Sequence, residues 1–217
     1  MRVLNLYCGI GGNRKLWGDE HDITAIENNK EVAALYLSNF PNDTVIVADA
    51  HQYLLENYKD FDFIWSSPPC PTHSRMMKFT RHNLAKYIDL KLYQEIIFLK
   101  HWFNGRWVIE NVEPYYDPLI APTKKVGRHL FWSNFNIGNF EPPKFKGDKL
   151  KSYNGELEDY YGFKLPTKNI YFKGSNDQFK VLKNCVHPET GKYVLDCALG
   201  VIRKSNVKQT SIFDEET

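Results

Sequence analysis

The sequence lacks the marks of several protein classes. Its apolar runs all fall well short of the roughly 20 residues that a membrane-spanning helix requires. The four cysteines form no C-x-x-C pair, so their spacing indicates neither a zinc site nor a disulfide framework. The first residues lead directly into a strand-like segment, so we expect no signal peptide. Together these absences favour an enzyme of a reducing, cytoplasmic compartment that holds no metal.

The sequence also has little net charge. Its 28 Lys and Arg residues against 26 Asp and Glu residues give a formal charge of +2 at pH 7. The charges are unevenly placed, with acidic residues in excess over residues 1–119 and basic residues in excess over residues 120–217. A basic second half favours a polyanionic partner, although plain surface solubility would give the same pattern.

One stretch organises the chain. Residues 61–67 form an apolar run that predicts a buried strand, and Pro68 and Pro69 end it because proline cannot donate to a sheet. Cys70 follows at once. Ligands of open α/β sheets bind at the carboxyl ends of the strands, so Cys70 is a candidate nucleophile. The alternative is an inert, buried cysteine after an ordinary turn.

The N-terminal segment predicts a nucleotide site. Residues 3–7 predict a buried strand, which breaks into the glycine-rich turn C-G-I-G-G at residues 8–12. We expect a helix around residues 14–17 to follow. Glycine lets the backbone approach a ligand closely, and a helix N-terminus offers free N–H groups. The turn differs from the dinucleotide pattern G-x-G-x-x-G, so by itself it indicates only a nucleotide-binding class.

Two further predicted strands end in carboxylates. Residues 22–27 end at Glu27, about twenty residues after the first strand, which is the spacing of an acid that binds ribose hydroxyls. Residues 44–49 end at Asp49, which could accept a hydrogen bond from the amine of adenine. The alternatives are that Glu27 starts the helix expected over residues 30–40, and that Asp49 caps a helix.

A third acid follows a fifth predicted strand. Residues 106–112 end in Glu110 and Asn111, and this strand is expected beside that of Cys70. Between the two lie a basic segment at residues 74–83, expected to be a mobile loop over the site, and a long helix predicted over residues 84–103.

The remainder of the chain changes character. An irregular stretch at residues 114–123 and another predicted strand at residues 127–135 complete the first part. Residues 136–180 hold only short apolar patches, so they predict an insertion or small subdomain instead of a second core. A helix is expected after Pro188, and the tail from Ser205 is expected to fray.

These motifs, in this order, resemble the cytosine-C5 DNA methyltransferases, especially the short phage-type members. L-Y-C-G-I-G-G at residues 6–12 is similar to the first family motif, P-P-C at 68–70 to the catalytic motif, and E-N-V at 110–112 to a third. N-C-V-H-P at 184–188 is similar to the closing segment. The resemblance runs nearly end to end.

The chain departs from the family pattern at four places. Asn5 stands where the family often has Asp, and Pro71 follows the cysteine where Gln is common. The arginine motif survives only as Arg128-His129, and the target-reading region is very short.

The resemblance implies an α/β fold of the Rossmann-like, S-adenosylmethionine-dependent methyltransferase type, with a mostly parallel sheet and helices on both faces. It implies a DNA (cytosine-5-)-methyltransferase that flips its target base out of duplex DNA and adds the Cys70 thiolate to the ring. Glu110 would protonate ring nitrogen N3, Asn111 would hold that carboxyl or the base edge, and Arg128 would stabilise the ring oxygen. The residues implied for S-adenosylmethionine are Tyr7, Gly9, Gly11, Gly12, Glu27, Asn28, Asp49, Ala50, Pro69, Asn184 and Val186, and those for DNA are Ser74, Arg75, Lys78 and Arg81.

The resemblance also divides the chain. Residues 1–135 would form the catalytic and cofactor-binding core, residues 136–180 a small target-recognition region, and residues 181–217 a C-terminal helix that returns to the core. The expected partner is duplex DNA, without a membrane or a metal, and a restriction endonuclease partner or a homodimer stays open. His73 and His82 are open between phosphate contacts and ordinary surface histidines.

Other functions fit the same motifs. A tRNA cytosine-C5 methyltransferase resembles the DNA enzymes and also has a minimal target region. A catalytically silent, DNA-binding accessory subunit is an alternative of another class, although Cys70 and Glu110 argue against it. A modification of cytosine other than methylation is a further alternative.

Overall fold

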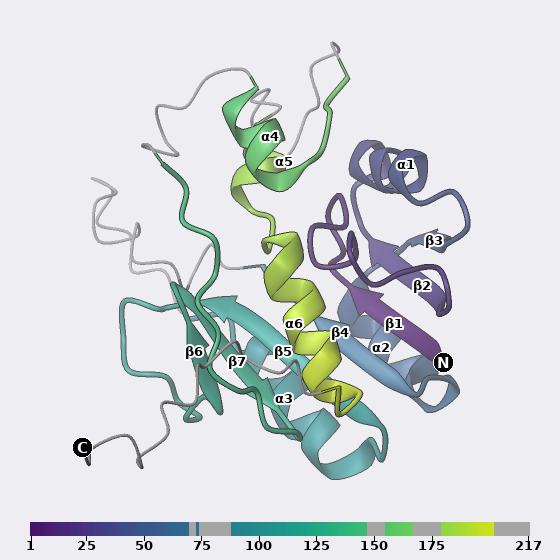
Figure 1. Cartoon of the computed structure of the whole chain (residues 1–217). Coiled ribbons are helices and arrows are strands. Elements are labelled where there is room, and N and C mark those ends of the chain that lie inside the picture. Colours follow the sequence, from purple (N-terminus) through teal and green to yellow (C-terminus); the bar gives the residue numbers. More distant parts are fainter. Residues whose placement is uncertain (70–72, 74–87, 147–154, 167–178, 202–217) are drawn as a thin grey trace, which may run out of the picture.

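A seven-stranded, mostly parallel sheet forms the centre of the molecule (Figure 1). The computed structural model describes residues 1–69, 73, 88–146, 155–166 and 179–201. The strand order is β3-β2-β1-β4-β5-β7-β6; β1 to β5 run parallel, whereas β7 is antiparallel to both β5 and β6. The strands are β1 (Arg2–Leu6), β2 (Asp22–Glu27), β3 (Thr44–Val47), β4 (Phe63–Ser66), β5 (Arg106–Val112), β6 (Lys124–Val126) and β7 (His129–Ser133).

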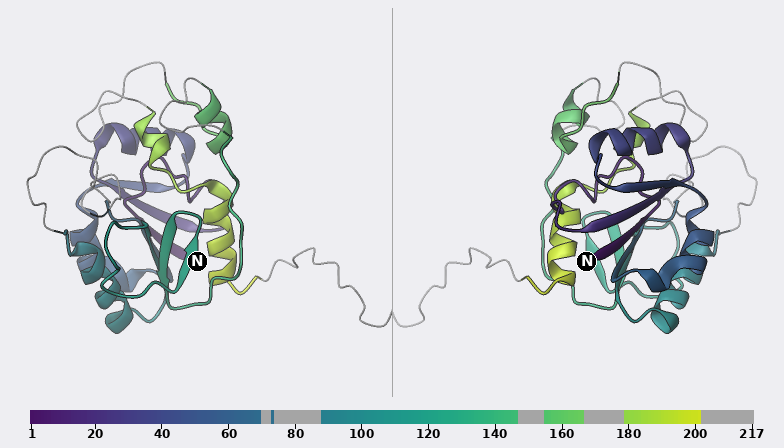
Figure 2. Two further views of the ribbon diagram at one scale, coloured as in Figure 1. Left: turned by 90° about the vertical axis from the view of Figure 1, so that its left-hand side faces the viewer. Right: turned by 90° about the vertical axis from the view of Figure 1, so that its right-hand side faces the viewer.

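Helices cover both faces of this sheet (Figure 2). Because side chains alternate along a strand, Leu4 and Leu6 of β1 pack against α2 and α3, whereas Val3 packs on the face covered by α6. The helices are α1 (Lys30–Asn39), α2 (Ala50–Asn57), the short 3₁₀ helix η1 (Tyr58–Asp60), α3 (Lys91–Trp102), α4 (Glu156–Tyr161), α5 (Lys180–Lys183) and α6 (Pro188–Ala198). The predicted α/β fold of the Rossmann-like class, with a mostly parallel sheet and helices on both faces, is confirmed. Within the described ranges no helix has the length and apolarity to cross a membrane.

The order of the strands reverses between β1 and β4. From β1 the chain builds outward to β2 and β3, and then returns to add β4 and β5 on the other side of β1. Leu6 and Ser66, the last residues of β1 and β4, are paired. The glycine-rich turn and the Pro68-Pro69 segment therefore leave the sheet side by side, at the kind of position where open α/β sheets bind ligands.

The prediction of a helix around residues 14–17 is wrong, because this segment forms turns. Arg14 is buried and makes two bonds of 2.9 Å to the carboxylate of Asp43. The hydroxyl of Tyr36 donates to the same carboxylate at 2.8 Å. A guanidinium that is fixed to a residue 29 positions away constrains the backbone more than its local helix propensity does.

Two other expectations need correction. The long helix begins at Lys91 and not at residue 84; residues 84–87 lie outside the described part, and residues 88–90 precede the helix. The predicted strand at residues 127–135 is shorter and pairs with β6, which was not predicted. The expected loop at residues 74–83 and the tail from Ser205 lie outside the described residues.

The last helix reaches back to the beginning of the chain. A Cβ on Gly191 of α6 would lie 2.2 Å from the carbonyl oxygen of Asn13. A Cβ on Gly12 would lie 2.4 Å from the carbonyl oxygen of Val186. Real Cβ atoms do not approach that closely, so these two glycines permit the contact between the first turn and the C-terminal segment.

Candidate active site

A side chain near the end of β5 holds the segment that leads to Cys70. The amide nitrogen of Asn111, near the end of β5, donates to the carbonyl oxygen of Pro68 at 3.0 Å. Its amide oxygen accepts from the N–H of Val112 at 2.9 Å. Asn111 thus fixes the proline turn two residues before Cys70. Cys70 itself, like Ser74, Arg75, Lys78 and Arg81, lies outside the described residues.

Glu110 lies on the opposite face of β5 from Asn111 and is 5% exposed. Its carboxylate contacts Nδ1 of His129 on the adjacent, antiparallel strand β7. Glu110 pairs with Phe131 in the sheet, and His129 is the neighbour two positions away on the same face. The sheet therefore places a buried carboxyl and an imidazole together at the edge where β4 also ends.

Arg128 directly precedes the histidine that contacts Glu110, and its own side chain points to other partners. Its guanidinium donates to the carbonyl oxygen of Lys183 at 3.2 Å, and its Nε approaches Nε2 of His129 at 3.4 Å. With Nε2 facing the guanidinium N–H, Nδ1 is the ring nitrogen that faces Glu110 and can donate to it. The chain Arg128–His129–Glu110 joins the α5 segment to the end of β5.

Sequence reasoning missed His129. The motif Arg128-His129 suggested Arg128 as the functional residue, whereas the antiparallel register of β5 and β7 places His129 beside Glu110. A sequence cannot give that register, because a shift of one residue exchanges the two faces of a strand.

The turn after β1 is held from beneath by Glu27. This buried carboxylate accepts from the backbone N–H of Gly9 at 3.1 Å and from that of Asn29 at 3.0 Å. Asn29, and not Glu27, is the N-cap of α1. Gly9 has a φ of +54°, and a Cβ there would meet nothing within 4 Å, so this glycine borders open space. Gly11 and Gly12, by contrast, pack against Phe40 and Val186.

The other predicted cofactor residues lie around this turn in different roles. Asp49 is exposed and caps α2 through the N–H of Gln52 at 2.9 Å, which is the structural alternative for this acid. Ala50 is buried in the first turn of α2, whereas Asn28 and Pro69 are exposed. Val186 is buried, and the Asn184 amide bonds the carbonyl oxygen of Lys180 at 2.6 Å.

Tyr7 turns away from the open edge. It is non-glycine but has a φ of +54°, and its hydroxyl donates to the carboxylate of Glu95 at 2.6 Å. Burial and the nearby negative charge of Glu95 raise the pKa of the Tyr7 hydroxyl well above its usual value. The phenol is therefore a permanent donor at neutral pH.

Two side chains near the site have clear structural roles. Cys8 is buried, and burial raises the pKa of its thiol well above the usual value, which keeps it protonated and unreactive. His73 is 1% exposed and contacts the hydroxyl of Tyr116, so the surface alternative for it is wrong. Burial lowers the pKa of His73, which favours the neutral imidazole. His82 lies outside the described residues.

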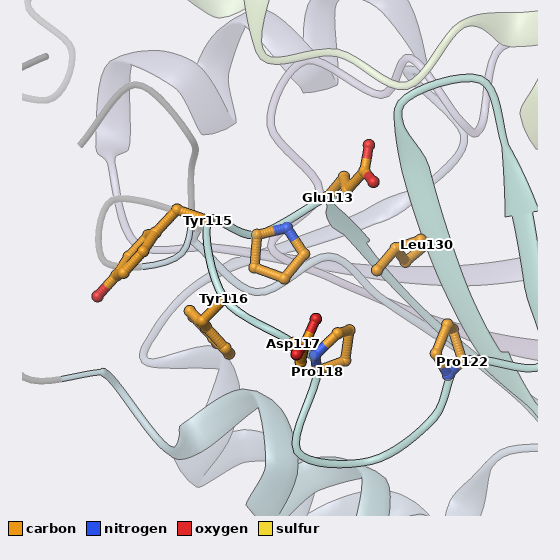
Figure 3. Close-up of a pocket in the computed structure, with 8 residues that line it drawn as sticks. Glu113, Tyr115, Tyr116, Asp117, Pro118, Pro122 and Leu130 are labelled. Atoms are coloured by element: carbon orange, nitrogen blue, oxygen red, sulfur yellow. The ribbon is translucent and has the colours of Figure 1, made fainter. Parts of the chain in front are cut away.

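A separate cavity of about 480 Å³ opens beside the end of β5 (Figure 3). It is lined by the irregular segment that follows β5 and by Leu130 of β7, and none of the candidate catalytic or cofactor residues that the structure describes is among the lining residues. The lining residues of the cavity are Glu113, Pro114, Tyr115, Tyr116, Asp117, Pro118, Pro122 and Leu130.

Across the ranges that the structure covers, no group of three or more His, Cys, Asp or Glu side chains could hold a metal ion.

In comparisons with known proteins, the chain matches one family model. The model of the C-5 cytosine-specific DNA methylases matches residues 1–114. No curated protein matches the chain. Among solved structures, a DNMT2 mutant from Spodoptera frugiperda is 26% identical with a TM-score of 0.40, over 54% of this chain and 37% of that one.

Two other solved structures are less similar in sequence. A putative DNA modification methyltransferase encoded within a prophage of E. coli is 18% identical with a TM-score of 0.38, over 54% of this chain and 34% of that one. A SAM-dependent methyltransferase from Agrobacterium tumefaciens is 16% identical with a TM-score of 0.35, over 54% of this chain and 40% of that one. The chain thus matches well under half the length of each of the three.

Proposed function

The chain belongs to the C-5 cytosine-specific DNA methylase family, and from this premise we propose that it methylates C5 of a cytosine in duplex DNA. The observation that carries the proposal is the pairing of Glu110 with His129 at the end of β5, next to the strand that leads to Cys70. A buried carboxyl at this place suits proton exchange with a ring nitrogen.

The residues around the first turn fit a nucleoside cofactor. Glu27 has used one lone pair of each oxygen on a backbone N–H, so both oxygens can still accept from ribose hydroxyls. Gly9 leaves the space beside it open, and Asp49 presents a solvent-accessible carboxylate. S-adenosylmethionine, when bound here, would supply an electrophilic methyl group. These acceptors would orient the nucleoside at the carboxyl ends of β1, β2 and β3.

Cys70 is the proposed nucleophile. C5 of cytosine is a poor nucleophile until its ring becomes enamine-like, and the addition of a thiolate to C6 achieves this. The new C–S bond pushes an electron pair toward C5, and N3 takes a proton as negative charge develops. After C5 has accepted the methyl group, N3 returns its proton to the acid, a base removes the C5 proton, the C–S bond breaks, and the thiolate of Cys70 is restored.

Glu110 is the proposed source of the proton at N3. His129 fixes the orientation of this carboxyl through Nδ1–H, and Arg128 in turn faces Nε2 of His129. We therefore assign Arg128 an indirect part in place of the direct contact with the ring oxygen that the family resemblance implies. Asn111 would support the nucleophile indirectly, through its bond to the carbonyl oxygen of Pro68.

Access to the target base defines the remaining roles. A cytosine inside a duplex must be flipped out, at a cost of a few kcal/mol. The cations Arg75, Lys78 and Arg81, with Ser74, are proposed to bind backbone phosphates at the flipped site. Residues 136–180 would contact the target sequence, with residues 1–135 as the catalytic core and residues 181–217 returning to it.

The test uses radiolabelled S-adenosylmethionine with the purified full chain. Duplex DNA and total tRNA are offered in parallel, together with DNA that carries 5-fluorocytosine. Label in duplex DNA and a covalent adduct on the fluorinated DNA are the expected results. Label in tRNA alone would replace DNA by tRNA as the substrate, and label without any adduct would overturn the cysteine mechanism.

A further inference from the structure

A fully buried glutamate occupies an apolar position of α3. The face of α3 that packs on the sheet contains Leu92, Ile96 and Leu99, spaced as in an amphipathic helix. Glu95 lies on this same face and is 0% exposed. Burial of a carboxylate costs several kcal/mol unless hydrogen bonds compensate for the lost water. The position therefore calls for an explanation beyond packing.

Three side chains from three different segments donate to this carboxylate. The hydroxyl of Tyr7, directly after β1, donates to Oε1 at 2.6 Å. The hydroxyl of Ser66, the last residue of β4, donates to Oε2 at 2.6 Å. Nδ1 of His51, in the first turn of α2, lies 3.1 Å from Oε1. The bonds thus join the first turn, the strand toward Cys70 and the helix that Asp49 caps.

The three segments meet where the strand order reverses. Leu6 and Ser66 are paired across β1 and β4, so Tyr7 leaves the sheet beside the strand that leads to the proline turn. The backbone at Tyr7 has a positive φ, which is uncommon for a bulky residue and needs a side chain held in place. Glu95 supplies that restraint from beneath the site, through α3.

We propose that Glu95 is a positioning residue that sets the relative placement of the cofactor-binding turns and the strand leading to Cys70. This inference rests on the proposed function in one respect, namely that the turns after β1 and β3 bind the nucleoside part of the cofactor. Loss of the carboxylate would release Tyr7 and His51 together, and the turns would lose their fixed geometry. Cofactor affinity would therefore fall more than global stability.

If Glu95 served stability alone, its replacement would change cofactor affinity no more than it changes the stability of the fold. Buried ionic groups that serve stability alone can be replaced by apolar side chains of similar volume with little loss, and sometimes with a gain. Glu95→Met restores packing without hydrogen-bond acceptors, whereas Glu95→Gln keeps shape and removes the charge. The two variants separate packing from positioning.

The experiment measures binding of S-adenosylhomocysteine by titration calorimetry and thermal unfolding, both on the full chain without nucleic acid. The expected result is a Kd raised about tenfold or more in Glu95→Gln and Glu95→Met, because bonds to a charged group are lost. Glu56→Gln, on the exposed side of α2, is the matched control and should bind like the wild type. The Met variant should unfold at or above the temperature of the Gln variant.

The outcomes are distinct. Wild-type affinity in both Glu95 variants would overturn this inference and leave the proposed function intact. Recovery of affinity together with stability in Glu95→Met would also overturn it, because packing would then suffice. A wild-type chain that binds no cofactor would overturn the proposed function, and this inference with it.

Discussion

Two buried glutamates of this molecule differ in their surroundings. Glu95 is fully enclosed and accepts from three donors on three segments, whereas Glu110 is 5% exposed and contacts His129 at the edge of the sheet. Hydrogen bonds from three segments hold the Glu95 carboxylate in one orientation. A carboxylate bonded from one side keeps the other oxygen for a substrate. The surroundings of Glu95 thus suit a positioning residue, and those of Glu110 suit a residue that contacts the substrate.

The proposed roles of both glutamates assume that Cys70 is the nucleophile. Cys70→Ser is expected to abolish methylation, because an alcohol at neutral pH provides almost none of the nucleophilic anion that a thiol provides. Cys8→Ser should retain turnover, since the Cys8 thiol is buried and its pKa is raised. Steady-state assays of both variants provide the measurement. Near-normal turnover in Cys70→Ser would contradict the covalent mechanism.

The sharpest contrast comes from the same substitution at the two glutamates. Glu110→Gln should lower kcat by about 10²- to 10⁴-fold, which is the usual contribution of a positioned acid. The Kd for S-adenosylhomocysteine should stay within about twofold, because a group that acts in the transition state adds little to ground-state binding. Glu95→Gln should show the larger change in Kd. If both variants alter the same parameter, the two carboxylates do not differ in role.

His129 tests the orientation of Glu110. His129→Ala should lower kcat by about ten- to a hundredfold, the value of one hydrogen bond to a charged group. His129→Asn should recover most of this loss, because its amide N–H can occupy the place of Nδ1. His101→Ala is the control, since His101 is exposed and its Nδ1 bonds the carbonyl oxygen of Ile97 on its own helix. Equal loss in the Ala and Asn variants would assign His129 to packing.

The smallest expected effect concerns pH and His51. The hydrogen bond to Glu95 raises the pKa of His51, Asp49 raises it further, and burial and Lys91 act against this. A raised folded-state pKa stabilises the fold below the unfolded-state pKa, and this contribution disappears as pH rises through the folded-state pKa. His51→Ala should therefore flatten the fall in unfolding free energy as pH rises from the ordinary pKa of histidine, about 6.5, through the raised pKa of His51. Urea denaturation at several pH values measures it, and an unchanged slope would contradict the assignment.

Much of the sheet was predictable from local pattern. The strands at residues 22–27 and 106–112 have the predicted bounds. Glu27 is the last residue of the first of these strands, and Glu110 lies two residues before the end of the second. The family membership followed from the spacing of the motifs, and the matched model at residues 1–114 confirms it.

Long-range contacts decided what sequence reasoning missed. Arg14 lies in turns because Asp43 binds it, and His129 faces Glu110 because of an antiparallel register. Glu95 was within reach of the sequence, since its spacing from Leu92 and Leu99 places a lone charge in an apolar stripe. A charge in such a position indicates buried donors, although the sequence does not name them.

The contacts of Gly12 with Val186 and of Gly191 with Asn13 have a consequence for how the protein is made. Strands β1 to β5 leave the ribosome long before residue 186 does. At usual rates of synthesis the interval between Gly12 and Val186 is on the order of ten to thirty seconds. During that time the sheet can form, but the first turn has no C-terminal segment to close against. The face of the sheet that α2 and α3 cover can therefore pack first, whereas the face that α6 covers and the first turn are completed last.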